Sequence, residues 1–101
     1  MTVLIRQISE MIEEEIAGAR NYALLAVKYK TEHPTMSKAF YDICTDELRH
    51  INMLHGEVVK LIEQEKKDHG EPPAAMMAVY EYMHERQIKA VNEIKMMMQQ
   101  Y

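Results

Sequence analysis

Hydrophobic residues recur along the first third of the chain at alternating steps of three and four. This spacing places side chains on one face of an α-helix. The series comprises Ile5, Ile8, Ile12, Glu15, Ala19, Tyr22, Ala26 and Tyr29. Glu15 is its one charged member, whereas the adjacent Glu13 and Glu14 project to other sides of the helix. The pattern predicts a helix over residues 2–31 whose buried face is interrupted by a single carboxylate.

A similar series runs through the middle of the chain and predicts a second helix over residues 35–67. Its members are Met36, Phe40, Ile43, Glu47, His50, Leu54 and Leu61. Glu47 and His50 are three residues apart, so a helix presents both side chains to the same side. Glu57 also falls near this face, but a straight helix drifts from a strict seven-residue repeat, which makes Val58 an alternative buried position. The second helix therefore carries two polar residues within its apolar face.

The last third of the chain predicts a third helix over residues 73–100, with Pro73 suited to its first turn. One face of this helix would contain Met77, Glu81, His84, Ile88, Val91 and Met98. Glu81 and His84 form a second Glu-x-x-His pair. The methionines of this segment recur among apolar positions without a compact thioether motif. We therefore interpret them as packing residues or as part of an oligomer interface rather than as copper ligands.

Two short segments separate these helices. Residues 32–35 contain Pro34, and residues 68–73 contain Gly70 and two prolines, which disfavour a continuous helix. The first break is short enough to return the chain as an antiparallel helical hairpin. The sequence thus predicts an all-α fold, a hairpin plus a third helix, within a single domain over residues 1–101. A domain of this size gains stability from association with a second copy.

Composition and charge narrow the range of functions. The chain is 48% hydrophobic and 28% charged, which suits long helices, and its net charge of -4 comes with dispersed basic residues. No basic patch of the kind that binds nucleic acid stands out, and no apolar run is long enough to cross a membrane. Cys44 is the single cysteine, which excludes an internal disulfide and a zinc site built on paired thiols. We therefore expect a cytoplasmic protein with neither a nucleic-acid nor a membrane partner.

Glu15, Glu47 and His50 have side chains suited to binding a metal ion. Burial of an uncompensated carboxylate is costly, and a cation would offset that cost. Two carboxylates and an imidazole that project into a helix bundle bind iron or manganese and leave coordination positions open for oxygen or peroxide. The alternative is that the three residues lie at a hydrated interface or form a hydrogen-bonded network in the core.

Two segments resemble the ferritin-like superfamily, in particular bacterioferritins, rubrerythrins and the short encapsulated ferritins. The first is EIAGARNY, which begins at Glu15 and ends at Tyr22, and the second is DELRH, which contains Glu47 and His50. The resemblance covers residues 12–61. It implies that Glu15 is a terminal iron ligand, that Glu47 bridges two irons and that His50 is a nitrogen ligand. It also implies that Tyr22 contacts a ligand, although packing in the core explains this residue equally well.

One copy of the chain lacks half of the ligands of such a site. A complete ferritin-like dinuclear centre takes one Glu from each of two helices and a Glu-x-x-His from each of two others. A symmetric dimer would supply them, because the first two helices of both copies would form a four-helix bundle. Alternatively, Glu81 and His84 would provide the second Glu-x-x-His, but a fourth helix and its Glu would still be missing. We favour the homodimer, with the third helix as a supporting or assembly element.

The resemblance implies a dinuclear iron protein, with manganese as an alternative metal, that oxidises Fe(II) with oxygen or peroxide in iron handling or peroxide detoxification. This ferroxidase or peroxidase-like oxidoreductase would need an external electron donor for peroxidase turnover, because the chain has no CxxC pair for a rubredoxin-type centre. It could also be cargo within an encapsulating shell. The competing hypothesis is a non-catalytic helical oligomer with a structural metal or a polar interface. For His33, His55 and His69 we expect loop or surface positions, and for Cys44 a packed one.

Overall fold

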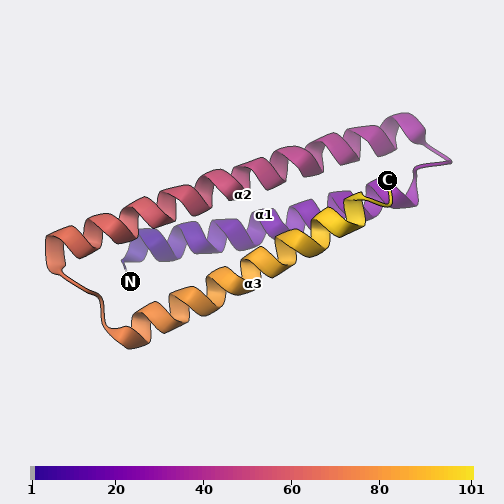
Figure 1. The fold of residues 1–101 in the computed structure, drawn as a ribbon. Coiled ribbons are helices and arrows are strands. Elements are labelled where there is room, and N and C mark those ends of the chain that lie inside the picture. Colours follow the sequence, from indigo (N-terminus) through magenta and orange to yellow (C-terminus); the bar gives the residue numbers. More distant parts are fainter. Residues whose placement is uncertain (1) are drawn as a thin grey trace.

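The computed structural model describes residues 2–101 and consists of three α-helices arranged as an elongated bundle (Figure 1). α1 spans Val3–Lys28, α2 spans Pro34–His69 and α3 spans Ala74–Met98. The described residues contain no strand, which confirms the all-α prediction. The helices run along the long axis of a body that measures 55 × 17 × 17 Å. α1 begins near the connection between α2 and α3, and the C-terminus lies near the turn between α1 and α2 (Figure 1).

Local sequence sets the helix boundaries close to those expected. Thr2 caps α1, and its side-chain oxygen accepts a hydrogen bond from the Ile5 amide at 3.2 Å. α2 begins at Pro34, which suits a first turn because proline lacks the amide hydrogen that this position leaves unpaired. α2 is followed by Gly70, whose φ of 79° lies in the left-handed region that favours glycine. Pro73 then precedes α3.

The buried core of the hairpin repeats every seven residues. α1 buries Ile5, Ile12, Ala19 and Ala26 at this spacing, and α2 buries Ser37, Cys44, Ile51 and Val58. This is the repeat of coiled-coil packing, in which one face stays toward the neighbouring helix along its length. The Ser37 hydroxyl donates a hydrogen bond to the Ala26 carbonyl oxygen, so this buried polar group is paired. The Cys44 thiol donates to the Ala19 carbonyl oxygen at 3.3 Å, which confirms its packed position.

The predicted face of α2 is displaced from the observed core. Met36 and Ile43 are 55% and 37% exposed, whereas their neighbours Ser37 and Cys44 are buried. The three-and-four spacing fits both sets of residues because they lie side by side on the same helix. Contacts with the other helices decide which set is covered, as Cys44 shows by its contacts with Ala19 of α1 and Met98 of α3. The alternative at Val58 is confirmed, since this residue is buried.

The predicted face of α3 is wrong at two positions. Glu81 and Ile88 are exposed, while Gln87 and Ile94 are buried. The reason is that methionines and tyrosines are distributed around this helix, so its sequence contains no single distinct apolar face. The contacts of α3 with α1 then select which residues are covered.

α3 lies along α1 and leaves a groove of about 570 Å³ against α2. Its walls come from residues 41–55 of α2, residues 88–98 of α3 and Gln99, which follows α3. Arg20 on α1 and Glu93 on α3 form an ion pair at 3.6 Å, and the ring of Tyr101 stacks on Tyr41 with centroids 4.4 Å apart. These contacts attach the end of α3 to the hairpin. None of the described helices combines the length and the apolar composition that crossing a membrane requires.

Candidate metal centre

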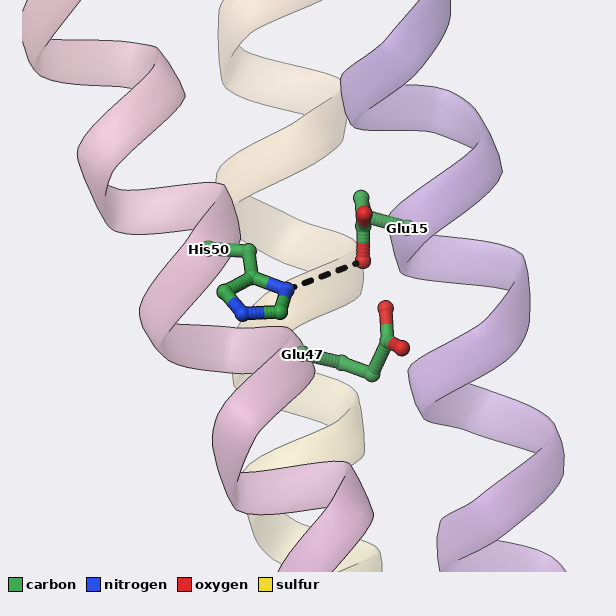
Figure 2. A group of neighbouring side chains, drawn as sticks. All are labelled: Glu15, Glu47 and His50. Carbon is green, nitrogen blue, oxygen red and sulfur yellow. Dashed lines mark ion pairs between the residues drawn. The ribbon is translucent and has the colours of Figure 1, made fainter.

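Glu15 of α1 and the Glu47–His50 pair of α2 converge between the two helices of the hairpin (Figure 2). One ligand atom from each of the three side chains lies within 4.8 Å of the other two. The three-residue spacing on α2 places Glu47 and His50 on the same side, and the antiparallel hairpin brings Glu15 opposite them. α3 passes behind the three side chains in Figure 2. The structure therefore brings together the three residues that the sequence singled out.

The Glu15 carboxylate has one oxygen without a hydrogen-bond partner. Its Oε2 atom is buried and receives no hydrogen bond from the described residues. The Nδ1 atom of His50 lies 3.6 Å away, beyond hydrogen-bonding distance. A buried carboxylate oxygen left in this way costs free energy, because it has lost water without gaining a donor. A divalent cation held by Glu15, Glu47 and His50 would satisfy this oxygen, so the donor set fits a metal ion.

Gly18 lies one turn after Glu15 and leaves the side of Glu47 open. A Cβ atom at this position would stand 3.7 Å from Glu47 Oε2, an ordinary contact distance. The glycine is therefore not required to avoid a clash within one chain. A glycine inside a helix costs about 1 kcal/mol relative to alanine. Because glycine has no side chain, the surface of α1 beside Glu47 stays free of bulky groups.

The cluster lies on a surface that carries exposed hydrophobic side chains. We call this surface the hairpin face; its members are Leu4, Met11, Glu15, Met36, Ile43, Glu47 and His50. Leu4 and Met11 are 50% and 49% exposed, similar to Met36 on α2. Met11 and Leu4 precede Glu15 by the same two intervals that separate Ile43 and Met36 from Glu47. Because α1 and α2 are antiparallel, these apolar residues extend from the cluster in opposite directions.

Tyr22 packs against Phe40, with ring centroids 6.1 Å apart. The contact joins α1 to α2 beside the hairpin core, which agrees with the packing interpretation of this tyrosine. Its predicted contact with a metal ligand stays a prediction.

Glu81 and His84 are not brought to the cluster. Glu81 is exposed on α3, while the ring of His84 packs edge-on against His55 and parallel to Tyr80, with centroids 4.9 and 5.9 Å away. Burial lowers the pKa of His84, and the nearby His55 lowers it further, against an opposing effect of Glu85. The structure thus places this Glu-x-x-His pair apart from Glu15, Glu47 and His50.

A polar network around Gln87 was not expected from the sequence. The side-chain amide nitrogen of Gln87 donates to Ser9 Oγ and to Glu13 Oε1, each at 3.2 Å, and its oxygen lies 2.9 Å from His55 Nε2. His55 is half-buried and hydrogen-bonded to Gln87, so it is less exposed than expected, whereas His33 and His69 are exposed as expected. The available signal was spacing, because Gln87 lies seven residues before the buried Ile94 and so belongs to a buried heptad position.

Comparison with known proteins places the chain in a family. No curated protein and no solved structure matches it. A family model matches residues 2–95, which include all of α1 and α2 and most of α3. The chain therefore belongs to the family described as "Domain of unknown function (DUF6306)".

Proposed function

We propose that the chain contributes half of a dinuclear iron centre and that its homodimer oxidises Fe(II) with oxygen or peroxide. The observation that carries this proposal is the buried, partnerless Oε2 of Glu15, which lies beside Glu47 and His50. A structural core network would be expected to pair this oxygen with a donor. A cation is the partner that the surrounding donor atoms suit.

The donor set favours iron or manganese. Carboxylate oxygens with a single imidazole nitrogen are typical ligands of carboxylate-bridged metal pairs in helix bundles, and no thiolate is near to favour a softer metal. One chain supplies two carboxylates and one imidazole, which is half of the ligand set of such a centre. A second copy would supply the other half.

The hairpin face supports a symmetric dimer. Its exposed apolar residues lie on both sides of the carboxylate cluster, and a two-fold axis through the cluster would cover them with the same surface of the partner. The two hairpins would then form a four-helix bundle with α3 of each copy outside it. Gly18 would allow a partner side chain to approach Glu47 closely.

Bound iron would supply electron transfer to oxygen or peroxide and Lewis acidity. The chain's own contribution is to hold the ions and restrict water. Glu15 and Glu47 would balance the positive charge, His50 would supply a nitrogen ligand, and the apolar residues of the hairpin face would exclude solvent from the closed site. Repeated peroxide reduction would require an external electron donor, since the sequence carries no CxxC pair.

The proposal includes a role in iron handling or peroxide detoxification in the cytoplasm, where the single buried Cys44 would stay reduced. A partner that donates electrons and a shell that encloses the dimer are further parts of the same proposal. Their basis is the resemblance of the Glu15–Tyr22 and Asp46–His50 segments to ferritin-like proteins.

The enzymatic activity is tested by anaerobic loading with Fe(II), followed by oxygen or peroxide. We expect oxidant consumption together with the absorption of a ferric dinuclear centre. Glu15→Gln, Glu47→Gln and His50→Gln should each abolish both signals. Glu14→Gln is the matched control, because Glu14 is an exposed neighbour on the same helix and should leave them unchanged. Metal binding without oxidant consumption would instead support the non-catalytic oligomer with a structural metal.

A further inference from the structure

The interface between α2 and α3 contains a pair of histidines outside the Glu15 cluster. The imidazole rings of His55 on α2 and His84 on α3 have centroids 4.9 Å apart and planes inclined by 83°. Both residues are half-buried, and His55 lines the groove between the two helices, which connects it with solvent. Neither histidine takes part in the proposed iron centre.

Gln87 determines which nitrogen of His55 carries the proton. The carboxylate of Glu13 can only accept a hydrogen bond, so the Gln87 amide nitrogen must face it and Ser9. The Gln87 oxygen then faces His55, and His55 must donate from Nε2 across 2.9 Å. In the neutral imidazole this leaves the lone pair on Nδ1. A hydrogen bond that fixes one ring nitrogen as a donor and frees the other is the usual support of a metal-binding histidine.

We propose that His55 and His84 bind one divalent cation of borderline character, such as Zn²⁺, Cu²⁺ or Ni²⁺, between α2 and α3. Two imidazoles that bind one ion at about 2.0–2.1 Å hold their ring centres about 5 Å apart, which agrees with the separation of the two rings. The ring of His84 turns about its Cβ–Cγ bond to present a nitrogen, and this broad torsion leaves the ring centre in place.

The two imidazole side chains determine which class of metal ion this site would bind. Two imidazole nitrogens suit zinc, copper and nickel, whereas magnesium and calcium require oxygen ligands. Water from the groove completes the coordination. The bound ion links α2 to α3 beside the end of the groove that His55 lines, independently of the hairpin face on which the iron site is proposed.

Titration of the intact chain with Zn²⁺ tests this site directly. The imidazole ¹⁵N–¹H correlations of the five histidines report which rings bind the ion. We expect the signals of His55 and His84 to shift together and to saturate at one Zn²⁺ per chain for this pair. The same two signals should respond in a Glu15→Gln/His50→Gln variant, which separates this site from the proposed iron centre.

Calorimetry of single variants provides the second measurement. His55→Gln and His84→Gln should each weaken zinc binding at this site at least tenfold, whereas His69→Gln, at an exposed position of α2, should leave it unchanged. The proposal is overturned if saturating Zn²⁺ leaves the His55 and His84 signals of the wild-type chain in place. It is equally overturned if His69→Gln weakens zinc binding as much as His84→Gln does. The NMR result needs no variant and holds even where a substitution impairs folding.

Discussion

In its proposed role, Glu15 would bind the metal, but in the metal-free chain the same side chain has an energetic cost. Its Oε2 atom is buried without a hydrogen-bond partner, so the metal-free chain bears the cost of one carboxylate oxygen that has lost water without gaining a donor. Replacement of an uncompensated buried charge by an apolar side chain of similar size often stabilises a protein. Replacement of Glu15 by an apolar residue should therefore raise the stability of the metal-free chain and weaken its metal binding.

Glu15→Met should raise the stability of the metal-free chain by about 1 kcal/mol and abolish iron binding. Urea unfolding without metal measures the first effect, and iron titration measures the second. Glu14→Met, at the adjacent exposed position, should leave both within experimental error of the wild type. A loss of metal-free stability in Glu15→Met would show that Glu15 is already paired, against our account of its role.

The Cys44 thiol gives a pH-dependent prediction at the residue scale. Burial raises the pKa of this thiol above the ordinary value of 9.0. In the unfolded chain the thiol ionises at its ordinary pKa, so the unfolded state releases the proton first as the pH increases. The corresponding stability is present below pH 9.0 and is lost as the pH rises toward the pKa of the folded state.

Cys44→Ser removes this ionisation and supplies the comparison. We expect the difference in unfolding free energy between wild type and Cys44→Ser to shift in favour of the variant between pH 8 and pH 10, since only the wild type carries the ionising thiol. Unfolding curves across this range measure it. A difference independent of pH would contradict the raised pKa.

At the scale of the helix, the sequence predicted the elements better than their buried faces. Proline and glycine set the helix ends by local chemistry, so the breaks at Pro34 and Gly70 were predictable. Glu47 and His50 share a side because of helical spacing alone. The choice between Ile43 and its buried neighbour Cys44 depends on where α1 packs, which is a non-local contact that spacing does not encode.

Ile51 and Ile43 therefore form a matched pair on α2. Ile51 is 1% exposed and belongs to the hydrophobic core, so Ile51→Ala should lower the unfolding free energy by about 2–4 kcal/mol through loss of packing and a cavity. Ile43→Ala should cost the isolated chain less than about 1 kcal/mol, because its side chain is partly exposed. Unfolding at low protein concentration measures both, and equal losses would show that the helix packs through a different face.

Gln87 is the side chain through which all three helices are hydrogen-bonded together. Gln87→Ala would leave Ser9, Glu13 and His55 without this partner and should cost about 1–3 kcal/mol. Thermal unfolding checks the prediction, with Gln7→Ala at an exposed site of α1 as the control. An unchanged melting temperature would mean that water replaces the amide without loss. Neither His55 nor Gln87 stood out in the sequence, because their significance depends on three helices meeting.

For the whole molecule, the question is whether and how a second copy completes the proposed half-site. α3 packs on α1 and leaves the hairpin face exposed, with apolar side chains on both sides of the carboxylates. The expectation of a second set of ligands came from the sequence, since one chain carries only half of a ferritin-like set. The sequence could not indicate which surface a partner covers, because the predicted and observed stripes of α2 are adjacent and equally apolar.

Met36→Glu should dissociate the proposed dimer by introducing like charges at the hairpin face, and should reduce iron binding although it alters no ligand. Analytical ultracentrifugation measures the first effect and iron titration the second. Met53→Glu is the control, at an exposed methionine of α2 outside the hairpin face. If Met36→Glu is a monomer and still binds iron fully, iron binding does not require the dimer, which would contradict the proposed shared site.

The stoichiometry of iron tests the central claim most directly. Native mass spectrometry of the chain loaded anaerobically with Fe(II) reports the mass of the assembly and its metal content together. Our account predicts two irons in each dimer and no tightly bound iron in the monomer. In Glu15→Gln the dimer should lose both irons. A monomer that binds two irons, or a dimer that binds none, would contradict it.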